Sequence, residues 1–247
     1  MRYLLYSRLA RYYDLIYAKK DYRAEAAELM RVIGRYQRSE GRELLEVACG
    51  TGRYLERFEE RYRCTGLDLN RPMLRIARRR LERSRLVAGD MLSFDLGVQF
   101  DVVACLFSSI GYIHGPRNLR KTVRNFAAHL KPGGVLLISP WVSREDFVVG
   151  RPDLDTYQDD DVKIARAVVS GLKGENVSRV RFHWLIAERN RPVRHIDDDV
   201  HELAMHSRQD FLDAMRAAGL APKLMRGTVR ANGSLRLYVG VKPVTGA

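Results

Sequence analysis

Apolar residues recur along the chain in short continuous runs that alternate with helical patterns. Between residues 43 and 139 the runs are four to seven residues long, and the segments between them place apolar residues three or four positions apart. Such runs predict buried strands, and the spacing between them predicts helices. The predicted strands span 43–48, 63–68, 85–88, 100–106 and 133–139, and the predicted helices span 52–61, 71–83 and 116–130. This alternation predicts an α/β fold with a doubly wound, Rossmann-like and mostly parallel sheet.

Past residue 150 the period of the pattern changes to two. Residues 162–170 and 177–186 alternate apolar and polar positions around a glycine-containing turn, so they predict an antiparallel hairpin. A third run at 193–205 is expected to pair beside it, in an antiparallel β insertion that covers the ligand-binding edge or an oligomer interface. Ser207 then caps a predicted helix that ends at Gly219. Two final strands are expected to complete a seven-stranded sheet, near 222–230 and 235–242.

The segment before the first strand is helical and rich in tyrosine. Apolar residues between Ala26 and Ile33 share one face of a helix that is expected to begin near Asp21 and to end at or just beyond Gly34. Each buried hydroxyl needs a hydrogen-bond partner, so this segment carries more tyrosines than a buried helix face accommodates. We expect some of them to line a ligand site, and packing of an N-terminal helix is the alternative for each one: Tyr3, Tyr6, Tyr12, Tyr13, Tyr17 and Tyr22.

Composition narrows the class of protein. No stretch approaches the 18 apolar residues of a membrane span, and the N-terminus lacks the uninterrupted apolar segment of a signal peptide, so we expect a cytoplasmic protein without a membrane partner. The three cysteines lie in or beside predicted buried strands, which is typical of core residues and not of disulfides: Cys49, Cys64 and Cys105. Histidine and carboxylate spacing predicts no metal site.

The net charge of +13 and the pI near 9.9 raise the question of a polyanionic partner. Many basic residues fall in residues 71–85, on a predicted helix that lies away from the carboxyl ends of the strands. A solvated helix face is therefore the favoured interpretation, and a nucleic-acid partner is disfavoured. Steering of a phosphorylated small substrate is a second interpretation of this charge.

A glycine-bracketed turn follows the first predicted strand, where Glu43 to Gly52 read ELLEVACGTG. Small residues let a backbone approach a ligand, so Gly50 and Gly52 are expected to shape a nucleoside pocket. A dinucleotide fingerprint needs a third glycine, and Leu55 stands there instead, so NAD is disfavoured. A tight strand-to-helix connection without a ligand is the plain alternative.

Two carboxylates continue this pattern along the chain. Asp68 ends the second predicted strand, 22 positions after Glu46, and Asp90 follows the third strand after 22 more. A carboxylate at the end of a second strand accepts hydrogen bonds from ribose hydroxyls. Together with the turn and with Gly89-Asp-Met91, this register resembles the class I S-adenosylmethionine-dependent methyltransferases.

A narrower resemblance rests on segments spread over most of the chain. Val47-Ala-Cys-Gly-Thr-Gly52 and Phe107-Ser-Ser-Ile-Gly-Tyr112 are the more specific ones, joined by Tyr13-Asp-Leu-Ile-Tyr17, Lys20-Asp-Tyr22, Phe94-Asp-Leu and Val200-His-Glu-Leu203. These segments resemble the bacterial nucleotide-sugar N,N-dimethyltransferases, which methylate the amino group of dTDP-linked aminosugars in antibiotic pathways. The resemblance implies S-adenosylmethionine as cofactor and no required metal.

The resemblance also implies roles for individual residues. The expected cofactor contacts are Tyr22, Glu46, Ala48, Gly50, Asp68, Met73, Asp90, Met91 and Leu106, with Gly52 in the turn. The expected substrate contacts are Tyr13, Ser108, Tyr112, Trp141 and His201, for which the aromatic members supply dry walls; a structural role is the alternative for His201. Tyr13 and His114 are the candidate catalytic residues, with His114 orienting or relaying a proton, or else lying exposed in a loop.

The chain departs from the pattern of this family at Ser139-Pro-Trp-Val142 and at Leu235-Arg236, near the expected acceptor pocket. A methyltransferase with another nitrogen or oxygen acceptor therefore stays open. The net charge of +13 keeps an RNA-modifying protein as a further alternative, and a silent cofactor-binding module is the last one. We expect one methyltransferase domain over 1–247. Association of two chains into a homodimer is an open alternative to a monomer. The parts of the domain would be an N-terminal helical cap, a cofactor-binding core, the antiparallel insertion and the end of the core sheet, at 1–38, 43–140, 150–206 and 207–247.

Overall fold

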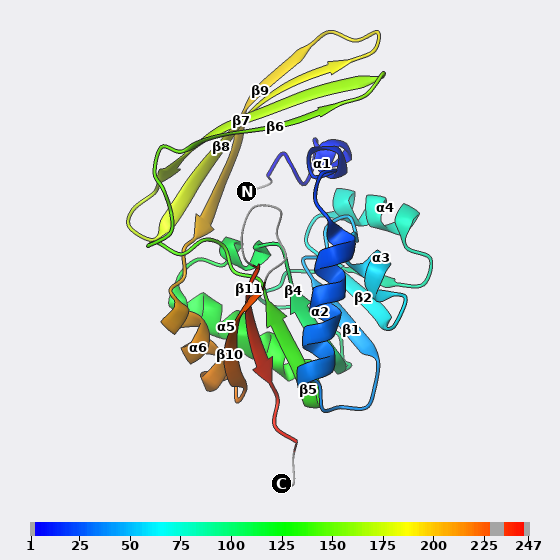
Figure 1. Cartoon of the computed structure of the whole chain (residues 1–247), viewed down its shortest axis with the longest axis vertical. Coiled ribbons are helices and arrows are strands. Elements are labelled where there is room, and N and C mark those ends of the chain that lie inside the picture. The colour runs from blue at the N-terminus through cyan, green and yellow to red at the C-terminus, as the bar shows by residue number, and fades with distance from the viewer. Residues whose placement is uncertain (1–2, 228–234, 245–247) are drawn as a thin grey trace.

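The computed structural model describes residues 3–227 and 235–244, and they form two separate sheets (Figure 1). The larger sheet has seven strands in the order β10-β11-β5-β4-β1-β2-β3. Its strands β1 to β5 are parallel, whereas β11 runs antiparallel to β5 and β10 antiparallel to β11. The bounds are β1 Glu43–Val47, β2 Arg63–Asp68, β3 Arg85–Ala88, β4 Phe100–Cys105, β5 Leu130–Ile138, β10 Ala221–Gly227 and β11 Leu235–Val241. The predicted Rossmann-like fold is therefore confirmed.

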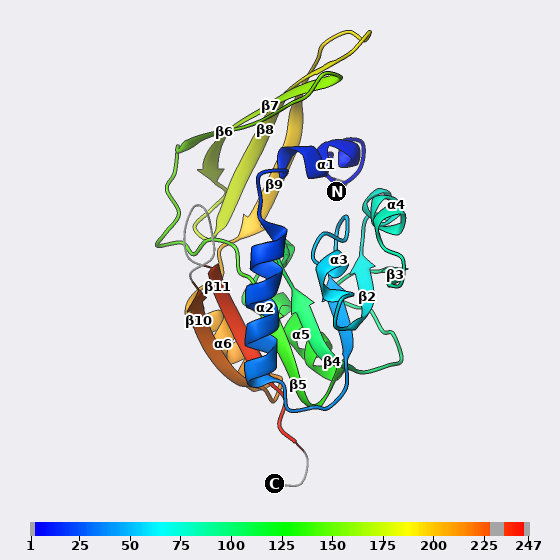
Figure 2. The ribbon, with the colours of Figure 1, turned by 45° about the vertical axis from the view of Figure 1, so that its right-hand side comes forward.

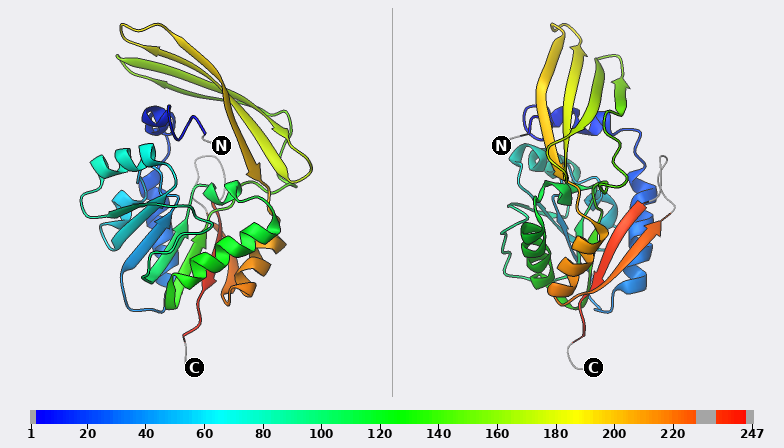
Figure 3. Two further views of the ribbon diagram at one scale, coloured as in Figure 1. Left: turned by 180° about the vertical axis from the view of Figure 1, so that it is seen from behind. Right: turned by 90° about the vertical axis from the view of Figure 1, so that its left-hand side faces the viewer.

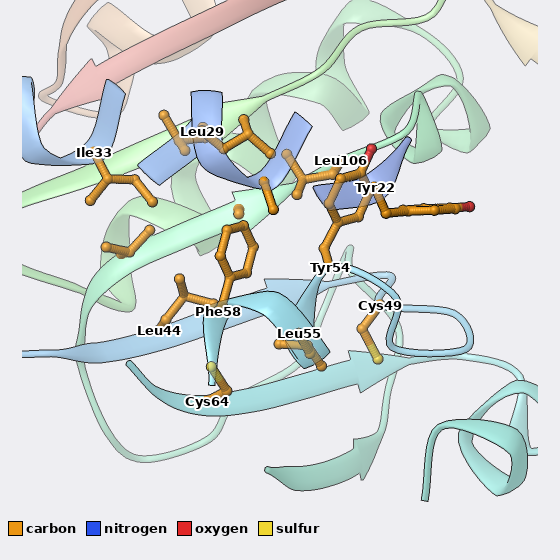
Figure 4. Packing of buried hydrophobic residues seen from close by; sticks show 14 of the residues in the cluster. Tyr22, Leu29, Ile33, Leu44, Cys49, Tyr54, Leu55, Phe58, Cys64 and Leu106 are labelled. Carbon is orange, nitrogen blue, oxygen red and sulfur yellow. The ribbon is translucent and has the colours of Figure 1, made fainter. Parts of the chain in front are cut away.

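Helices cover both faces of this sheet, as the views from the front and from behind show (Figures 1 and 3). Alternate strand residues point to opposite faces, so Leu44 packs under α2 and α3 whereas Leu45 packs under α5 and α6. The bounds are α2 Tyr22–Tyr36, α3 Leu55–Phe58, α4 Arg71–Arg80, the 3-10 helix η1 Ser109–Tyr112, α5 Pro116–Ala128 and α6 Arg208–Ala217. Figure 4 shows the first of these two layers, where Leu29 and Ile33 of α2 meet Phe58 of α3.

The four-stranded antiparallel sheet lies across the carboxyl edge of the large one (Figures 1 and 2). Its order is β6-β7-β8-β9, with bounds β6 Pro152–Gln158, β7 Val162–Leu172, β8 Val177–Glu188 and β9 Arg194–Ala204. The short helix α1, Ala10–Ile16, packs beneath this sheet, where Leu9 and Ile16 meet Trp184. The insertion and the N-terminal segment thus share a core of their own above the site.

Three expectations need adjustment. The helix expected at 52–61 is regular only from Leu55 to Phe58, and turns flank it on both sides. The strand expected at 222–230 ends at Gly227, and positions 228–230 lie outside the described residues. Strand β6 was not expected, because its residues are polar and mostly exposed, so no apolar period marks it.

The prediction that the arginines of α4 lie on a solvated face is confirmed for most of them and wrong for Arg80. Arg75, Arg78 and Arg79 are exposed, whereas the Arg80 side chain is only 17% exposed and bonds to Asp14. All three cysteines are buried and free. In residues 3–227 and 235–244, no group of three or more His, Cys, Asp and Glu side chains is arranged to hold a metal ion. Within the same ranges, no helix combines the length and apolar character of a membrane span.

Candidate active site

A cavity of about 540 Å³ opens at the carboxyl edge of the large sheet, beneath the insertion and α1. It lies at the switch point of the sheet, where the chain passes from β1 to β2 on one side and from β4 to β5 on the other. The structure brings twelve of the predicted site residues to its wall: Tyr13, Ala48, Gly50, Asp68, Met73, Asp90, Met91, Ser108, Tyr112, His114, Trp141 and His201. Residues that the sequence predicted for one site thus lie together, and the role of each stays a prediction.

The glycine turn after β1 has three residues in the left-handed region. Ala48, Gly50 and Gly52 have φ values of 57°, 56° and 77°. The amide of Gly50 donates to Asp68 Oδ2 at 2.8 Å, which fixes the turn against the end of β2. A Cβ at Gly52 would lie 2.7 Å from Leu81 Cδ1, so Gly52 serves the packing of the turn on α4 and does not line the cavity.

Two carboxylates line the same half of the cavity. Asp68 is buried, and its Oδ1 accepts from the backbone N–H of Asn70 at 2.7 Å. Burial raises the pKa of Asp68 above its ordinary value, and the amides of Asn70 and Gly50 oppose that shift. Asp90 is exposed at the end of β3, where its Oδ1 accepts from the N–H of Leu92 at 2.9 Å. Both carboxylates therefore retain acceptor capacity toward hydroxyl groups of a ligand.

Glu46 lies in β1, two residues before the turn, and is buried. Burial, and after it the negative charge of Asp68, raise the pKa of Glu46 well above its usual range. Its Oε2 atom has no hydrogen-bond partner among the described residues. An unpartnered buried acceptor is costly unless a ligand supplies the donor. The amino group of S-adenosylmethionine is such a donor, so this half of the site fits the cofactor that the sequence implies.

The backbone is strained where β4 ends. Phe107 and Ser108 both lie in the left-handed region, with φ values of 50° and 65°. Non-glycine residues held there cost about 1–3 kcal/mol each, and such strain concentrates at functional sites. The Ser108 hydroxyl donates to the carbonyl oxygen of Pro140 at 2.9 Å, which holds the turn in place. As a result, both side chains lie on the cavity wall.

The second half of the cavity is aromatic. The ring centroids of Tyr13 and Tyr17 are 4.9 Å apart, and Tyr17 meets Phe107 edge-on at 5.0 Å. Burial raises the pKa of Tyr13 and of Tyr112 well above the ordinary tyrosine value, so their hydroxyls stay neutral. Among the described residues that line the cavity, none is lysine or arginine. Aromatic faces attract cations, so this wall suits a sulfonium or an ammonium group.

Trp141, which follows β5, and His201, which lies in β9 of the insertion, also line this wall. The indole N–H of Trp141 donates to Ser178 Oγ on β8 at 2.9 Å. His201 on β9 is only 1% exposed, and its Nδ1 lies 2.6 Å from the hydroxyl of Tyr112. His114 is exposed by contrast, and its Nε2 lies 3.0 Å from the carbonyl oxygen of Glu202.

Four predicted contacts do not line the cavity, namely Tyr22, Glu46, Gly52 and Leu106. Tyr22 and Leu106 lie in the core cluster beneath α2, where Tyr22 packs edge-on against Tyr54 at 5.1 Å (Figure 4). The contacts of Tyr22, Glu46 and Leu106 with the cofactor stay predictions. The wall also contains residues that the sequence did not single out, because no motif marks them: Leu5, Leu69, Asn70, Leu92, Asn118, Val180 and Phe182.

Known proteins share both the sequence and this architecture. A methyltransferase domain family matches residues 44–134. The chain is 38% identical over 232 residues to dTDP-3-amino-3,4,6-trideoxy-alpha-D-glucopyranose N,N-dimethyltransferase of Streptomyces venezuelae, covering 93% of this chain and 95% of the relative. It is 35% identical over 240 residues to dTDP-3-amino-3,6-dideoxy-alpha-D-glucopyranose N,N-dimethyltransferase of Streptomyces fradiae, covering 96% and 93%.

Two solved structures of sugar N-methyltransferases also resemble this chain. DesVI of Streptomyces venezuelae superposes with a TM-score of 0.86 at 37% identity, over 94% of this chain and 98% of that one. An amino pentose methyltransferase of Micromonospora echinaspora, solved with bound S-adenosylmethionine, gives 0.80 at 36% identity, over 90% and 92%. The chain therefore belongs to the S-adenosylmethionine-dependent N-methyltransferases, in the family of the dTDP-aminosugar N,N-dimethyltransferases.

Proposed function

We propose that this enzyme methylates the amino group of a nucleotide-linked aminosugar. The observation that supports this acceptor is a single cavity with two unlike halves, one with carboxylates at the glycine turn and the other with tyrosine rings. Relatives that act on dTDP-linked 3-amino and 4-amino sugars are 33% to 38% identical over 91% or more of their length. The same relatives are named for N,N-dimethylation, so we propose two successive transfers.

The chain's own residues hold and orient the two reactants. Bound S-adenosylmethionine supplies a methyl group on a positively charged sulfur. Asp68 and Asp90 are placed to accept hydrogen bonds from the hydroxyls of the cofactor. Glu46 is buried and does not line the cavity, and its unpartnered oxygen makes it the candidate partner for the amino group of the cofactor. Met73, Met91 and Ala48 would pack along the nucleoside. Holding two reactants in line supplies about 7–11 kcal/mol of a barrier, so orientation is the main task of this site.

The aromatic half would receive the sugar. Tyr13, Ser108 and Trp141 line the cavity, where the hydroxyls of Tyr13 and Ser108 suit the hydroxyl groups of a hexose. The indole N–H of Trp141 already donates to Ser178, so Trp141 would offer its ring face. With no described lysine or arginine on the wall, the cavity offers nothing to neutralise a diphosphate. The sugar would therefore enter the cavity while the nucleotide stays at its mouth.

Incubation of the full chain with methyl-labelled S-adenosylmethionine and a panel of dTDP-linked aminosugars tests this proposal. The expected products are a monomethylamine followed by a dimethylamine on the sugar. The panel also contains free amino acids and hydroxyl acceptors of similar size. Label that appears only on those acceptors, or on no acceptor while the cofactor still binds, would refute the proposed substrate.

We propose that the chain acts as one domain in the cytoplasm, either alone or as a homodimer, without a nucleic-acid partner. The exposed arginines of α4 support only a basic surface. Sedimentation measures the oligomeric state, and retention on heparin that collapses with modest salt, without selective RNA binding, would identify the charge as unspecific.

A further inference from the structure

A chain of hydrogen bonds leads from the cavity wall to a buried carboxylate. The hydroxyls of Tyr6 and Tyr112 are 2.7 Å apart, and the Tyr112 hydroxyl lies 2.6 Å from Nδ1 of His201. Nε2 of His201 in turn lies 3.0 Å from Oδ1 of Asp199. The two tyrosines and the histidine line the cavity, whereas Asp199 lies behind them and is 1% exposed.

The partners of Asp199 fix its charge and the tautomer of the histidine. Its oxygens face four N–H groups, from the backbone of Leu4 and Leu5, from the indole of Trp184 and from Nε2 of His201. A protonated carboxyl would point its own hydrogen at one of these donors, so the ionised form is favoured. An ionised carboxylate only accepts, so Nε2 of His201 carries the hydrogen. Nδ1 of the neutral ring is then an acceptor, and the hydroxyl of Tyr112 donates to it.

We infer that His201 takes up the proton that the acceptor amine loses, with Tyr112 as the relay. This inference rests on the amine acceptor of the proposed function, since an aliphatic amine arrives as an ammonium ion at neutral pH. The N–H bond of the ammonium breaks and its electron pair stays on nitrogen. The proton passes to the hydroxyl oxygen of Tyr112, whose own hydrogen moves to Nδ1 of His201. Tyr112 ends neutral, and the imidazolium lies beside the carboxylate of Asp199.

The surroundings favour this route over one through His114. Tyr3 stacks on the His201 ring with centroids 4.5 Å apart, and Phe182 meets it edge-on at 5.1 Å, so the ring is held in one orientation. Among the residues that the structure describes, no carboxylate is hydrogen-bonded to His114, whose ring is exposed and bonds a backbone carbonyl oxygen. A methylated amine carries a proton again after the first transfer, so the same relay serves a second one once the imidazolium of His201 has released its proton to water.

The groups that face the relay carry little positive charge. Tyr3, Tyr6, Tyr13 and Tyr17 surround it from the N-terminal segment and α1, and Asp68 acts on Tyr6 from the large sheet. Glu202 of β9 acts on Tyr3, and Arg166 of β7 bonds the hydroxyl of Tyr17. Neutral tyrosines are what a relay needs, because a tyrosinate would retain the proton.

Rates measured as a function of pH test the inference. Tyr112→Phe and His201→Asn are expected to lower kcat/KM for the aminosugar about 100-fold near pH 6.5, a typical loss for acid–base catalysis. The deficit should shrink at least tenfold near pH 9.5, where more of the amine arrives unprotonated. Tyr36→Phe and His183→Asn are matched controls, since Tyr36 ends α2 far from the cavity and His183 is exposed on β8. A deficit that stays constant with pH would overturn the relay and leave a structural role.

A second measurement needs neither variant nor acceptor. In the wild-type enzyme, nitrogen NMR of the His201 ring is expected to show hydrogen on Nε2 and none on Nδ1 near neutral pH. Hydrogen on Nδ1 would overturn the relay whatever the substrate is. Wild-type enzyme that methylates no aminosugar at any pH would instead refute the proposed function, and the tautomer would still decide whether this histidine is set up to accept a proton.

Discussion

Arg80 Nη2 lies 2.6 Å from Asp14 Oδ2, which joins the basic helix α4 to the tyrosine-bearing helix α1. Arg80 also donates through Nη1 to the carbonyl oxygen of Thr51 in the glycine turn, at 2.6 Å. The Thr51 hydroxyl completes the cluster by donating to Asp14 Oδ1 at 2.7 Å. One guanidinium thus connects the glycine turn to α1, the helix that carries Tyr13. A displacement of either element would therefore affect both halves of the cavity.

Replacing Arg80 should therefore weaken both the folded state and the binding of the cofactor. Arg80→Gln removes charge-assisted hydrogen bonds from groups that are four-fifths buried, and such bonds contribute about 1.5–3 kcal/mol. We expect a loss of about 1–2 kcal/mol in the free energy of unfolding and an increase of about tenfold in the dissociation constant of S-adenosylmethionine, measured by calorimetry. Arg79→Gln, on the exposed face of the same helix, is the control. Equal effects of the two substitutions would show that net charge and not this cluster matters.

Asp68 should be the more sensitive of the two cofactor carboxylates. Asp68→Asn leaves one acceptor oxygen and turns an NH2 group toward the N–H of either Gly50 or Asn70. The turn would lose its anchor and the ligand an acceptor, so we expect the dissociation constant of S-adenosylmethionine to rise tenfold or more in the same calorimetric assay. Asp198→Asn, exposed on β9, should leave it unchanged. An Asp68→Asn enzyme with wild-type affinity would remove Asp68 from the cofactor site.

The sequence could bring the residues of the expected cofactor half to one edge of the sheet, because that half is built from consecutive local signals. Gly50, Asp68 and Asp90 each end or follow an apolar run, and parallel strands bring their carboxyl ends to one edge. The acceptor half comes instead from segments more than a hundred residues apart, such as Tyr6 and His201. Their meeting depends on how the insertion folds back, and no local period contains that information.

The burial of Asp199 could not be predicted from the periodicity of the sequence. It is one of three consecutive aspartates, and alternation along a strand would give no reason to bury it. The register of β8 and β9 shifts between Phe182 and Trp184, so Asp197 and Asp198 are exposed while Asp199 turns inward. A β-bulge of this kind redirects a side chain and leaves no sequence signature. The contact of Arg80 with Asp14 could not be predicted either, since a helical period does not show which arginine of α4 contacts α1.

Gly111 permits the close approach of η1 to the insertion. A Cβ at this position would lie 3.1 Å from both Trp141 Cβ and Leu203 Cδ2. Gly111→Ala should therefore cost about 1–3 kcal/mol in the free energy of unfolding, as overpacking does, and raise the KM of the acceptor more than that of the cofactor. Gly34→Ala is the control, because nothing lies within 4 Å of the added Cβ in α2 and the helix should gain about 1 kcal/mol. A cofactor KM that rises as much as the acceptor KM would contradict this placement.

His206 should make stability depend on pH. It is buried, and its Nε2 donates to the carbonyl oxygen of Ile113 at 2.7 Å. Burial lowers the pKa of His206 below its value of 6.5, against the opposing influence of that carbonyl and of Asp210, while His114 adds to the lowering. Below pH 6.5 the unfolded chain binds a proton that the folded chain resists, so the free energy of unfolding falls as the pH falls toward the folded pKa.

Urea unfolding at pH 7.5 and at pH 5 measures this dependence in the wild type and in His206→Gln. The wild type is more stable at pH 7.5 because the neutral ring keeps its bond to Ile113. Glutamine does not titrate, so its deficit relative to the wild type should be smaller at pH 5 than at pH 7.5. His183→Gln, an exposed site on β8, should show no such change. A deficit for His206→Gln that is equal at both pH values would mean that His206 titrates alike in the folded and unfolded chain.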